Sequence, residues 1–487
     1  MSWPALSLEM REGGLSMWFR LRVSNREGTA FMSWFMGKRY YRWVILVACM
    51  LVYCTSQLVR WNYASITKYL STDLGMGKPE IGLLGSAFFY AYAIAQIPWG
   101  MATDLWGGRK VIPVGIAVLA LFLAGFAFSR TFTQAIVWRT LMGFMAAAGY
   151  VPITSVLSKW FPIRERGFAM EMYSGPGGGL GEALTFLMIP LIALVMSGGG
   201  IFGLRNWRGS TFVMAIVVLV IAIASAVMLR SDPKTMGLAS VEAEEDKKAD
   251  ATYKHAALGI TKDPALWVMS LVWSGYMIGA RLVPGWLPLY ATDFYMQKHG
   301  MAKGTAIVAG GAMATVYVLG RVIGTPLVGK LSDVLLKKFA VPRAVVIFAG
   351  LVGIAASFYG FTTPLASVYS LGALSFLSGI LINIFPLINA SAAEIWSIRT
   401  AGFSMGIINT IGQFAGAVAL SASGFMAVRY SVPGGAFHTE FLGIWYLGIL
   451  TSVFAAAAAL YVVYREKNAV AKQFAKKAAA DATGASQ

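Results

Sequence analysis

Apolar stretches long enough to cross a bilayer, each of roughly 20 residues or more, recur along almost the whole chain. Hydrocarbon offers no hydrogen-bond partner to an open backbone, and these stretches lack the alternating pattern of barrel strands, so they predict helices. We count twelve, at residues 43–69, 80–100, 110–129, 132–160, 167–195, 209–229, 265–293, 304–328, 344–362, 366–392, 400–427 and 440–464. The pattern therefore predicts an all-α polytopic membrane protein with twelve transmembrane helices in a lipid bilayer.

A longer polar segment divides these stretches into two sets of six, and it has no apolar periodicity of its own. We expect a tail over 1–42, a six-helix half over 43–229, a linker over 230–264, a second six-helix half over 265–464 and a tail over 465–487. Gly100 and Asp104 at the end of the second stretch recur as Gly329 and Asp333 at the end of the eighth. Matched halves of this kind are typical of transporters built from repeats.

Composition and charge add the orientation of the chain. The sequence is 57% hydrophobic and only 13% charged, yet it holds 40 Lys and Arg against 22 Asp and Glu. Twenty-eight of the cations fall in the tails and loops on the side of the termini, and eight fall in the opposite loops. The positive-inside rule then predicts two cytoplasmic termini in a cell inner membrane, so the basic balance needs no nucleic-acid partner. With 2 Cys and 3 His, neither a metal site nor a cofactor is expected.

The four remaining cations, Arg60, Arg139, Arg281 and Arg321, lie within the apolar stretches. An arginine near the centre of a membrane helix costs about 2.5–3.5 kcal/mol, so each one needs a reason. Its planar guanidinium suits bidentate binding of a carboxylate, phosphate or sulfonate. We hypothesise that Arg60 and Arg281, one from each half, bind an anion between them at the midplane. Alternatively, Arg60 extends to the outer surface.

Other side chains within the stretches are candidates for supporting roles. Glu182 is either a proton site that couples transport or the ion-pair partner of an arginine that substrate displaces, while Tyr90, Asn409 and Gln413 are candidate further contacts to substrate. Arg321 lies eight residues before Gly329, and we expect it to be close enough to the cytoplasmic surface to stabilise the Asp333 loop. Pro284 and Pro288, which follow Arg281, are expected to break the helix and to mark a cavity lining or gate.

The segment Gly100-Met-Ala-Thr-Asp104-Leu-Trp-Gly107-Gly108-Arg109-Lys110 resembles the loop signature G-x-x-x-D-x-x-G-R-[KR] of the major facilitator superfamily, with one extra residue. Residues 59–70 and 276–286 are similar to the first and seventh helices of its organophosphate:phosphate antiporters, whose anion-binding arginines match Arg60 and Arg281. The resemblance implies two six-helix halves, a central cavity and alternating access. It also implies gating contacts at the cytoplasmic surface, for which we take Asp104, Arg109, Asp333 and Arg321.

Comparison with the related families leaves the coupling of transport open, because one motif matches and other expected residues are replaced. Arg139-Thr-Leu-Met-Gly143 matches a fourth-helix R-x-x-x-G pattern of proton-coupled members and anion:cation symporters, so Arg139 binds anion, assists proton movement or pairs with a carboxylate. The acidic residues that usually accompany the symporter arginines are replaced by Val59 and by residues 144–147. The antiporters' lysine after the first arginine is Trp61 here, and a glycine run replaces their fifth-helix histidine.

The sequence thus predicts a transporter rather than an enzyme. We expect a monomeric secondary active transporter that moves a small organic anion (a carboxylate, phosphate ester or sulfonate) by alternating access, coupled to protons or to a counter-anion. The alternative is a transporter-like receptor that binds an anion and signals to a membrane partner.

Overall fold

The structure, a computed structural model, describes residues 40–200, 202–236, 259–396, 398–432 and 435–482. Within this part of the chain, twelve helical segments are long and apolar enough to cross a membrane, which confirms the predicted number. Most of the predicted N-terminal tail and the linker residues 237–258 lie outside the described residues.

The first half of the chain supplies six of the spans, two of them made of more than one helix. Its elements are α2 (Tyr41–Ser65), α3 (Thr67–Asp73), α4 (Lys78–Trp106), α5 (Gly108–Ala127), α6 (Phe132–Ala146), η1 (Ala147–Gly149), α7 (Val151–Trp160), α8 (Ile163–Met172), η2 (Tyr173–Gly177), α9 (Gly178–Val195), α10 (Asn206–Met228) and η3 (Pro233–Met236). Within this half, α2 packs on α9, α4 on α6, and α5 on α10.

The second half supplies the other six spans, two of them also made of more than one helical element. Its elements are α12 (Pro264–His299), α13 (Lys303–Phe339), α14 (Arg343–Thr362), α15 (Val368–Leu381), α16 (Phe385–Ile395), α17 (Ile398–Arg429), η5 (Phe437–Phe441) and α18 (Leu442–Ala482). Within this half, α12 packs on α17, α13 on α15, and α14 on α18.

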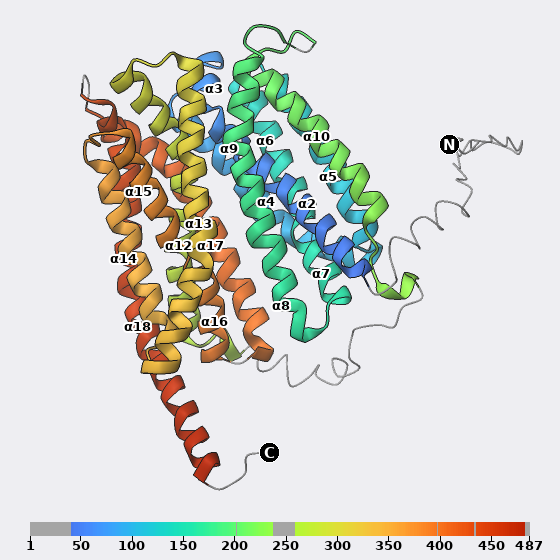
Figure 1. Cartoon of the computed structure of the whole chain (residues 1–487), viewed down its shortest axis with the longest axis vertical. Helices are drawn as coiled ribbons and strands as arrows, with labels where there is room; N and C mark the ends of the chain where they lie inside the picture. Colours follow the sequence, from blue (N-terminus) through green and yellow to red (C-terminus); the bar gives the residue numbers. More distant parts are fainter. Residues whose placement is uncertain (1–39, 201, 237–258, 397, 433–434, 483–487) are drawn as a thin grey trace, which may run out of the picture.

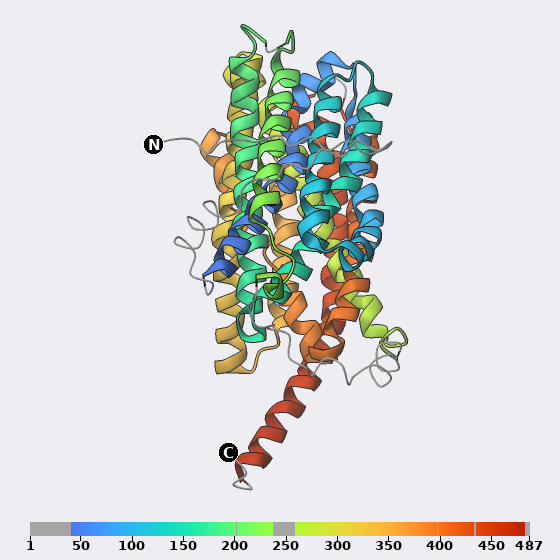
Figure 2. The ribbon, with the colours of Figure 1, turned by 90° about the vertical axis from the view of Figure 1, so that its right-hand side faces the viewer.

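The two halves lie side by side along the length of the bundle (Figures 1 and 2). They meet where α4 packs on α17, α9 on α13, and α2 on α12. In both of the first two pairs, the second span of one half packs against the fifth span of the other. This exchange of equivalent positions is what two structural repeats facing each other produce, and it agrees with the repeat seen in the sequence.

Helix α9 approaches α2 closely because the glycine run removes side chains at the contact. A Cβ atom added to Gly181 would lie 2.3 Å from the carbonyl oxygen of Cys54, so any larger residue would push the helices apart. The preceding residues Tyr173–Gly177 form a π-helical turn that contains Pro176. Wide turns of this kind are frequent at functional sites, and this one comes directly before the helix that carries Glu182.

We call the end of the bundle where residues 230–236 and Pro264 lie the linker end, and the opposite end, which includes α3, the far end (Figure 1). At the far end the halves are joined by two ion pairs, Lys68 to Asp293 and Lys78 to Glu440, each with a 2.5 Å nitrogen–oxygen distance. Backbones also touch there, because a Cβ atom on Gly424 would lie 2.4 Å from the Lys78 carbonyl oxygen. The far end is therefore closed.

One local expectation is wrong. Helix α12 runs without a break through Pro284 and Pro288, although both were expected to interrupt it. Membrane helices tolerate proline where neighbouring helices surround them. In the most apolar stretch of α12, 78% is buried inside the bundle, the highest share among the twelve spans of the described residues. Helix α18 continues beyond the predicted last span, through residues 465–482 of the predicted C-terminal tail.

Candidate functional site

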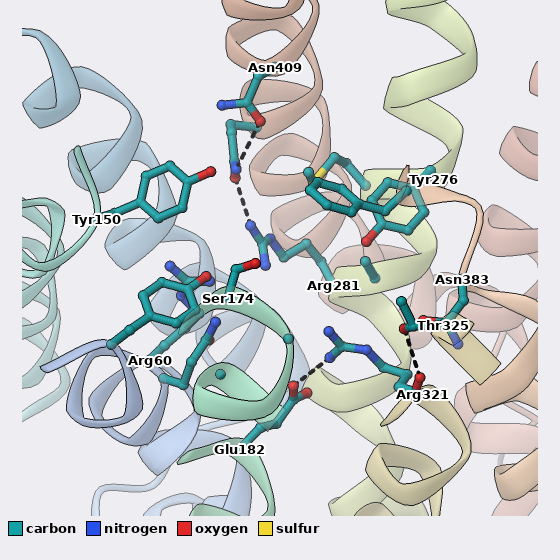
Figure 3. A pocket seen from close by; sticks show the side chains of 18 of the residues that line it. Arg60, Tyr150, Ser174, Glu182, Tyr276, Arg281, Arg321, Thr325, Asn383 and Asn409 are labelled. Atoms are coloured by element: carbon teal, nitrogen blue, oxygen red, sulfur yellow. Dashed lines mark hydrogen bonds and ion pairs between the residues drawn. The ribbon is translucent and has the colours of Figure 1, made fainter. Parts of the chain in front are cut away.

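A polar cavity of about 150 Å³ lies between the two halves, lined by residues from both (Figure 3). Of the predicted site residues, Arg60, Glu182, Arg281, Arg321, Asn409 and Gln413 line it. They come from α2 and α9 in the first half and from α12, α13 and α17 in the second. The fold therefore brings together residues that are up to 353 positions apart in the sequence, between Arg60 and Gln413.

Arg60 and Arg281 are both buried and lie around one aromatic ring. The Cζ atom of Arg281 is 4.0 Å from the centroid of Phe89, and that of Arg60 is 5.9 Å from the same centroid. Arg60 also lies 4.8 Å from the centre of the Tyr92 ring. Arg60 therefore points into the bundle and does not extend to the outer surface.

The two guanidinium groups lack a compensating carboxylate. Among the described residues, neither Arg60 nor Arg281 forms an ion pair, and the Nε atom of each is buried without a hydrogen-bond partner. Arg281 donates from Nη2 to Gln413 Oε1 at 2.6 Å, and Gln413 Nε2 lies 3.4 Å from Asn409 Oδ1. Two buried cations without counter-charge repel each other strongly in a low-dielectric interior. The arrangement can therefore hold an anion by bidentate, charge-assisted hydrogen bonds.

The remaining charged pair in the cavity joins the two halves. Glu182 on α9 accepts a hydrogen bond from Nη1 of Arg321 on α13 (Figure 3). Arg321 does not contact Asp333 as the sequence suggested, because α13 turns its side chain into the cavity. Asp333 is instead paired with Arg343, with a 2.6 Å distance between Oδ1 and Nη1.

Arg139 does not reach the cavity. It is fully buried and donates to the carbonyl oxygens of Val59 at 3.0 Å and Arg60 at 3.1 Å, with a weaker contact to Leu84 at 3.5 Å. Its Cζ atom also lies 4.7 Å from the ring centre of Tyr63. Among the described residues, its hydrogen-bond partners are backbone carbonyls and not a carboxylate, so this position favours a structural role. It fixes the part of α2 that carries Arg60.

Tyr90 is also outside the cavity, although it was expected to contact substrate. Its hydroxyl lies 3.5 Å from Ser421 Oγ, and its ring packs against Phe414, so it contributes to the contact between α4 and α17. Ser421 donates in turn to Ser86 at 2.6 Å across the same contact.

The cavity contains residues that sequence reasoning did not single out, Tyr53 and Gln57 among them. Both precede Arg60 on α2, by seven and three residues, and side chains at these spacings share one helix face. Helical spacing from Arg60 is therefore the signal that would have identified them. Tyr150 and Thr325 also line the cavity. Thr325 follows Arg321 by one helical turn of α13, whereas Tyr150 lies between η1 and α7, and no spacing from a predicted residue indicates it.

The proposed gating residues of the loop motif lie at the linker end. Asp104 is exposed near the end of α4 and forms no ion pair in the described part of the chain. Gly107 has φ +76°, a conformation that favours glycine, and it lets the chain reverse from α4 into α5. The backbone N–H of Arg109 donates to Ser231 Oγ at 2.9 Å. The hydrogen bonds observed between the halves, within the described residues, lie at the far end, at the α4–α17 contact or in the cavity, and none of them involves Asp104 or Arg109.

Twelve membrane-spanning helices in two facing halves, with a buried polar cavity between them, define a membrane transporter. The sequence profile of the Major Facilitator Superfamily matches residues 49–314 and 302–485, so the chain belongs to this superfamily of transporters, which are not enzymes.

Relatives and a solved structure agree with that assignment. The chain is 25% identical to the glycerol-3-phosphate transporter of Bacillus subtilis, over 80% of this chain and 87% of that protein. It is 26% identical to a probable sulfoacetate transporter of Cupriavidus necator, over 80% of this chain and 89% of that protein. In fold it resembles a bacterial homolog of the human lysosomal transporter Spinster, with a TM-score of 0.71 at 17% identity, over 89% of this chain and 98% of that chain.

Proposed function

We propose that the protein is a secondary active transporter of a small organic anion, and that Arg60 and Arg281 bind the anionic group. The observation that carries this proposal is the pair of buried guanidinium groups, one from each half, without a carboxylate to neutralise them. The proposal is supported by the two relatives named after anions, glycerol 3-phosphate and sulfoacetate. The substrate class covers carboxylates, phosphate esters and sulfonates, and transport is coupled to protons or to a counter-anion.

The transport cycle we propose is alternating access in a cell inner membrane. With the linker end on the cytoplasmic side, as the distribution of Lys and Arg favours, the closed far end makes this an inward-facing state. Closing the linker end would require the ion pairs at Lys68 and Lys78 to break. One chain contains both halves and the whole cavity, so we propose that the monomer is the transport unit.

A ligand screen by thermal shift on the purified protein tests the proposed substrate class. We expect at least one of a panel of carboxylates, phosphate esters and sulfonates to raise the melting temperature, since a ligand that binds the folded protein stabilises it. Neutral sugars and organic cations should have no effect. Stabilisation by sugars or cations but by no anion would contradict the proposal.

Asp104 is expected to act in the cycle and not in binding. Asp104→Asn should leave anion affinity within about twofold but slow liposome uptake by about tenfold, because one charge-assisted contact contributes about 1.5–3 kcal/mol. The exposure of Asp104 at the linker end supports a contact that forms only when this end closes. Asp104→Glu, which retains the charge, is the control and should transport faster than Asp104→Asn. Loss of binding in a folded Asp104→Asn protein would contradict the gating role.

A further inference from the structure

Glu182 is a buried carboxylate in the wall of the cavity. It is 1% exposed, and Oε2 accepts the hydrogen bond from Arg321. Its other oxygen, Oε1, is buried and has no hydrogen-bond partner. The Arg321 side chain is 33% exposed, so the cationic member of the pair is the one that an entering anion can reach. The pair also joins the halves, because Glu182 lies on α9 and Arg321 on α13.

The surroundings of Glu182 contain several cations and phenols. The titratable and charged groups that line the cavity with Glu182 are Tyr53 and Arg60 of α2, Tyr92 of α4, Tyr150 before α7, Glu171 of α8, Tyr276 and Arg281 of α12, and Arg321 of α13. Cys54 of α2, Tyr173 of η2 and Tyr317 of α13 lie on elements that pack against α9. Helix α10 also packs on α9. Its one charged or titratable side chain is Arg208, near the start of α10 at the far end of the bundle. Of the carboxylates that line the cavity, Glu182 is buried and Glu171 is exposed.

We propose that Glu182 is the proton-binding site that couples transport, and that the substrate anion triggers proton uptake by drawing Arg321 away from it. This inference rests on the proposed function and selects proton symport from the two couplings considered there. It assigns the proton to a residue of the fifth span.

The physical reason is the cost of a buried charge that has lost its partner. An anion held by Arg60 and Arg281 lies in the same cavity as Arg321, and it competes with Glu182 for the third guanidinium. A buried carboxylate without a counter-charge is strongly unfavourable, and such a group neutralises itself by binding a proton. The proton comes from water on the side where the substrate enters and forms an O–H bond on the carboxyl group. When the anion leaves, Arg321 pairs with Glu182 again and the proton returns to water on that side.

The test measures anion binding to the purified wild-type protein as a function of pH. The probes are sulfoacetate and L-galactonate, whose acidic groups stay ionised from about pH 6 to about pH 9, so the probes themselves take up no proton. We expect binding to remove protons from a weakly buffered solution. Because the protein with bound anion holds one more proton than the free protein, the Kd of each probe should rise with pH, by up to about tenfold per pH unit. A phosphate ester is unsuitable, since its second proton titrates near pH 6.

Variants then assign the proton to one residue. Glu182→Gln should bind the probes without proton uptake and with a Kd independent of pH, and in liposomes it should exchange labelled anion but lose uptake driven by a pH gradient. Glu182→Asp retains a carboxyl group and should recover the pH dependence. Glu171→Gln removes the other carboxylate that lines the cavity, and it should keep the wild-type proton uptake and the wild-type pH dependence of Kd.

The outcomes separate the two proposals. Absence of proton uptake by the wild-type protein would overturn the proton site even if Glu182→Gln failed to fold, and so would a Glu182→Gln protein that keeps the wild-type pH dependence. If no anion of the panel binds the wild-type protein, the proposed function itself fails.

Discussion

Replacing Arg281 with glutamine is expected to abolish anion binding at concentrations at which the wild-type protein is saturated. Arg281 provides one of two uncompensated guanidinium groups in the cavity, and its Nε atom is a buried donor without a partner. Removing one side of a buried, hydrogen-bonded charge contact costs about 2–5 kcal/mol, which raises Kd by about 30-fold to several thousandfold. Equilibrium binding of the best anion from the thermal-shift panel measures this loss directly.

The controls for this prediction separate charge from geometry. Arg281→Lys keeps the positive charge but loses the planar fork, so its Kd should lie between those of the wild-type and Arg281→Gln proteins. Arg60→Gln should weaken binding to a similar extent, since Arg60 approaches the same Phe89 ring from the other half. A folded Arg281→Gln protein with wild-type affinity would show that the anion binds elsewhere.

Arg139→Ala is expected to destabilise the protein more than substitution of the other described arginines outside the cavity. The side chain is fully buried, and its guanidinium donates to three backbone carbonyl oxygens, on Val59, Arg60 and Leu84. Truncation leaves a cavity and unsatisfied carbonyl groups, each a cause of large destabilisation. We expect a loss of about 3–5 kcal/mol in the free energy of unfolding. The melting temperature in detergent provides the measurement.

Arg130 is the matched control for Arg139, because it is an exposed arginine just before α6, the helix that carries Arg139. Arg130→Ala should leave the melting temperature within the scatter of repeated measurements. If Arg139→Ala folds with wild-type stability and binds anion poorly, the side chain acts in binding, contrary to its position outside the cavity.

The sequence predicts the number of spans well because transmembrane helices depend on the length of apolar stretches, a local property. It also identifies Arg60 and Arg281, since a cation in an apolar stretch is costly enough to need a specific reason. Nothing local predicts the roles of Arg139 and Arg321. Arg139 donates to carbonyl groups of α2 and α4, and Arg321 meets a carboxylate 139 residues earlier in the chain, so both roles depend on how the helices pack.

The difference between local sequence rules and helix packing also explains why α12 is longer than the prolines predict. Proline predicts a broken helix from its own geometry, yet α12 passes through Pro284 and Pro288 because neighbouring helices surround it. Local rules are therefore least reliable in the segments that the bundle buries most.

The central claim is that one anion binds between the arginines of the two halves, and a structure determined with the most stabilising anion of the panel tests it most directly. The account predicts density for the anion in the central cavity, with its acidic group within hydrogen-bond distance of the guanidinium groups of both Arg60 and Arg281. An anion bound outside this cavity, or in it without contact to either arginine, would contradict the account.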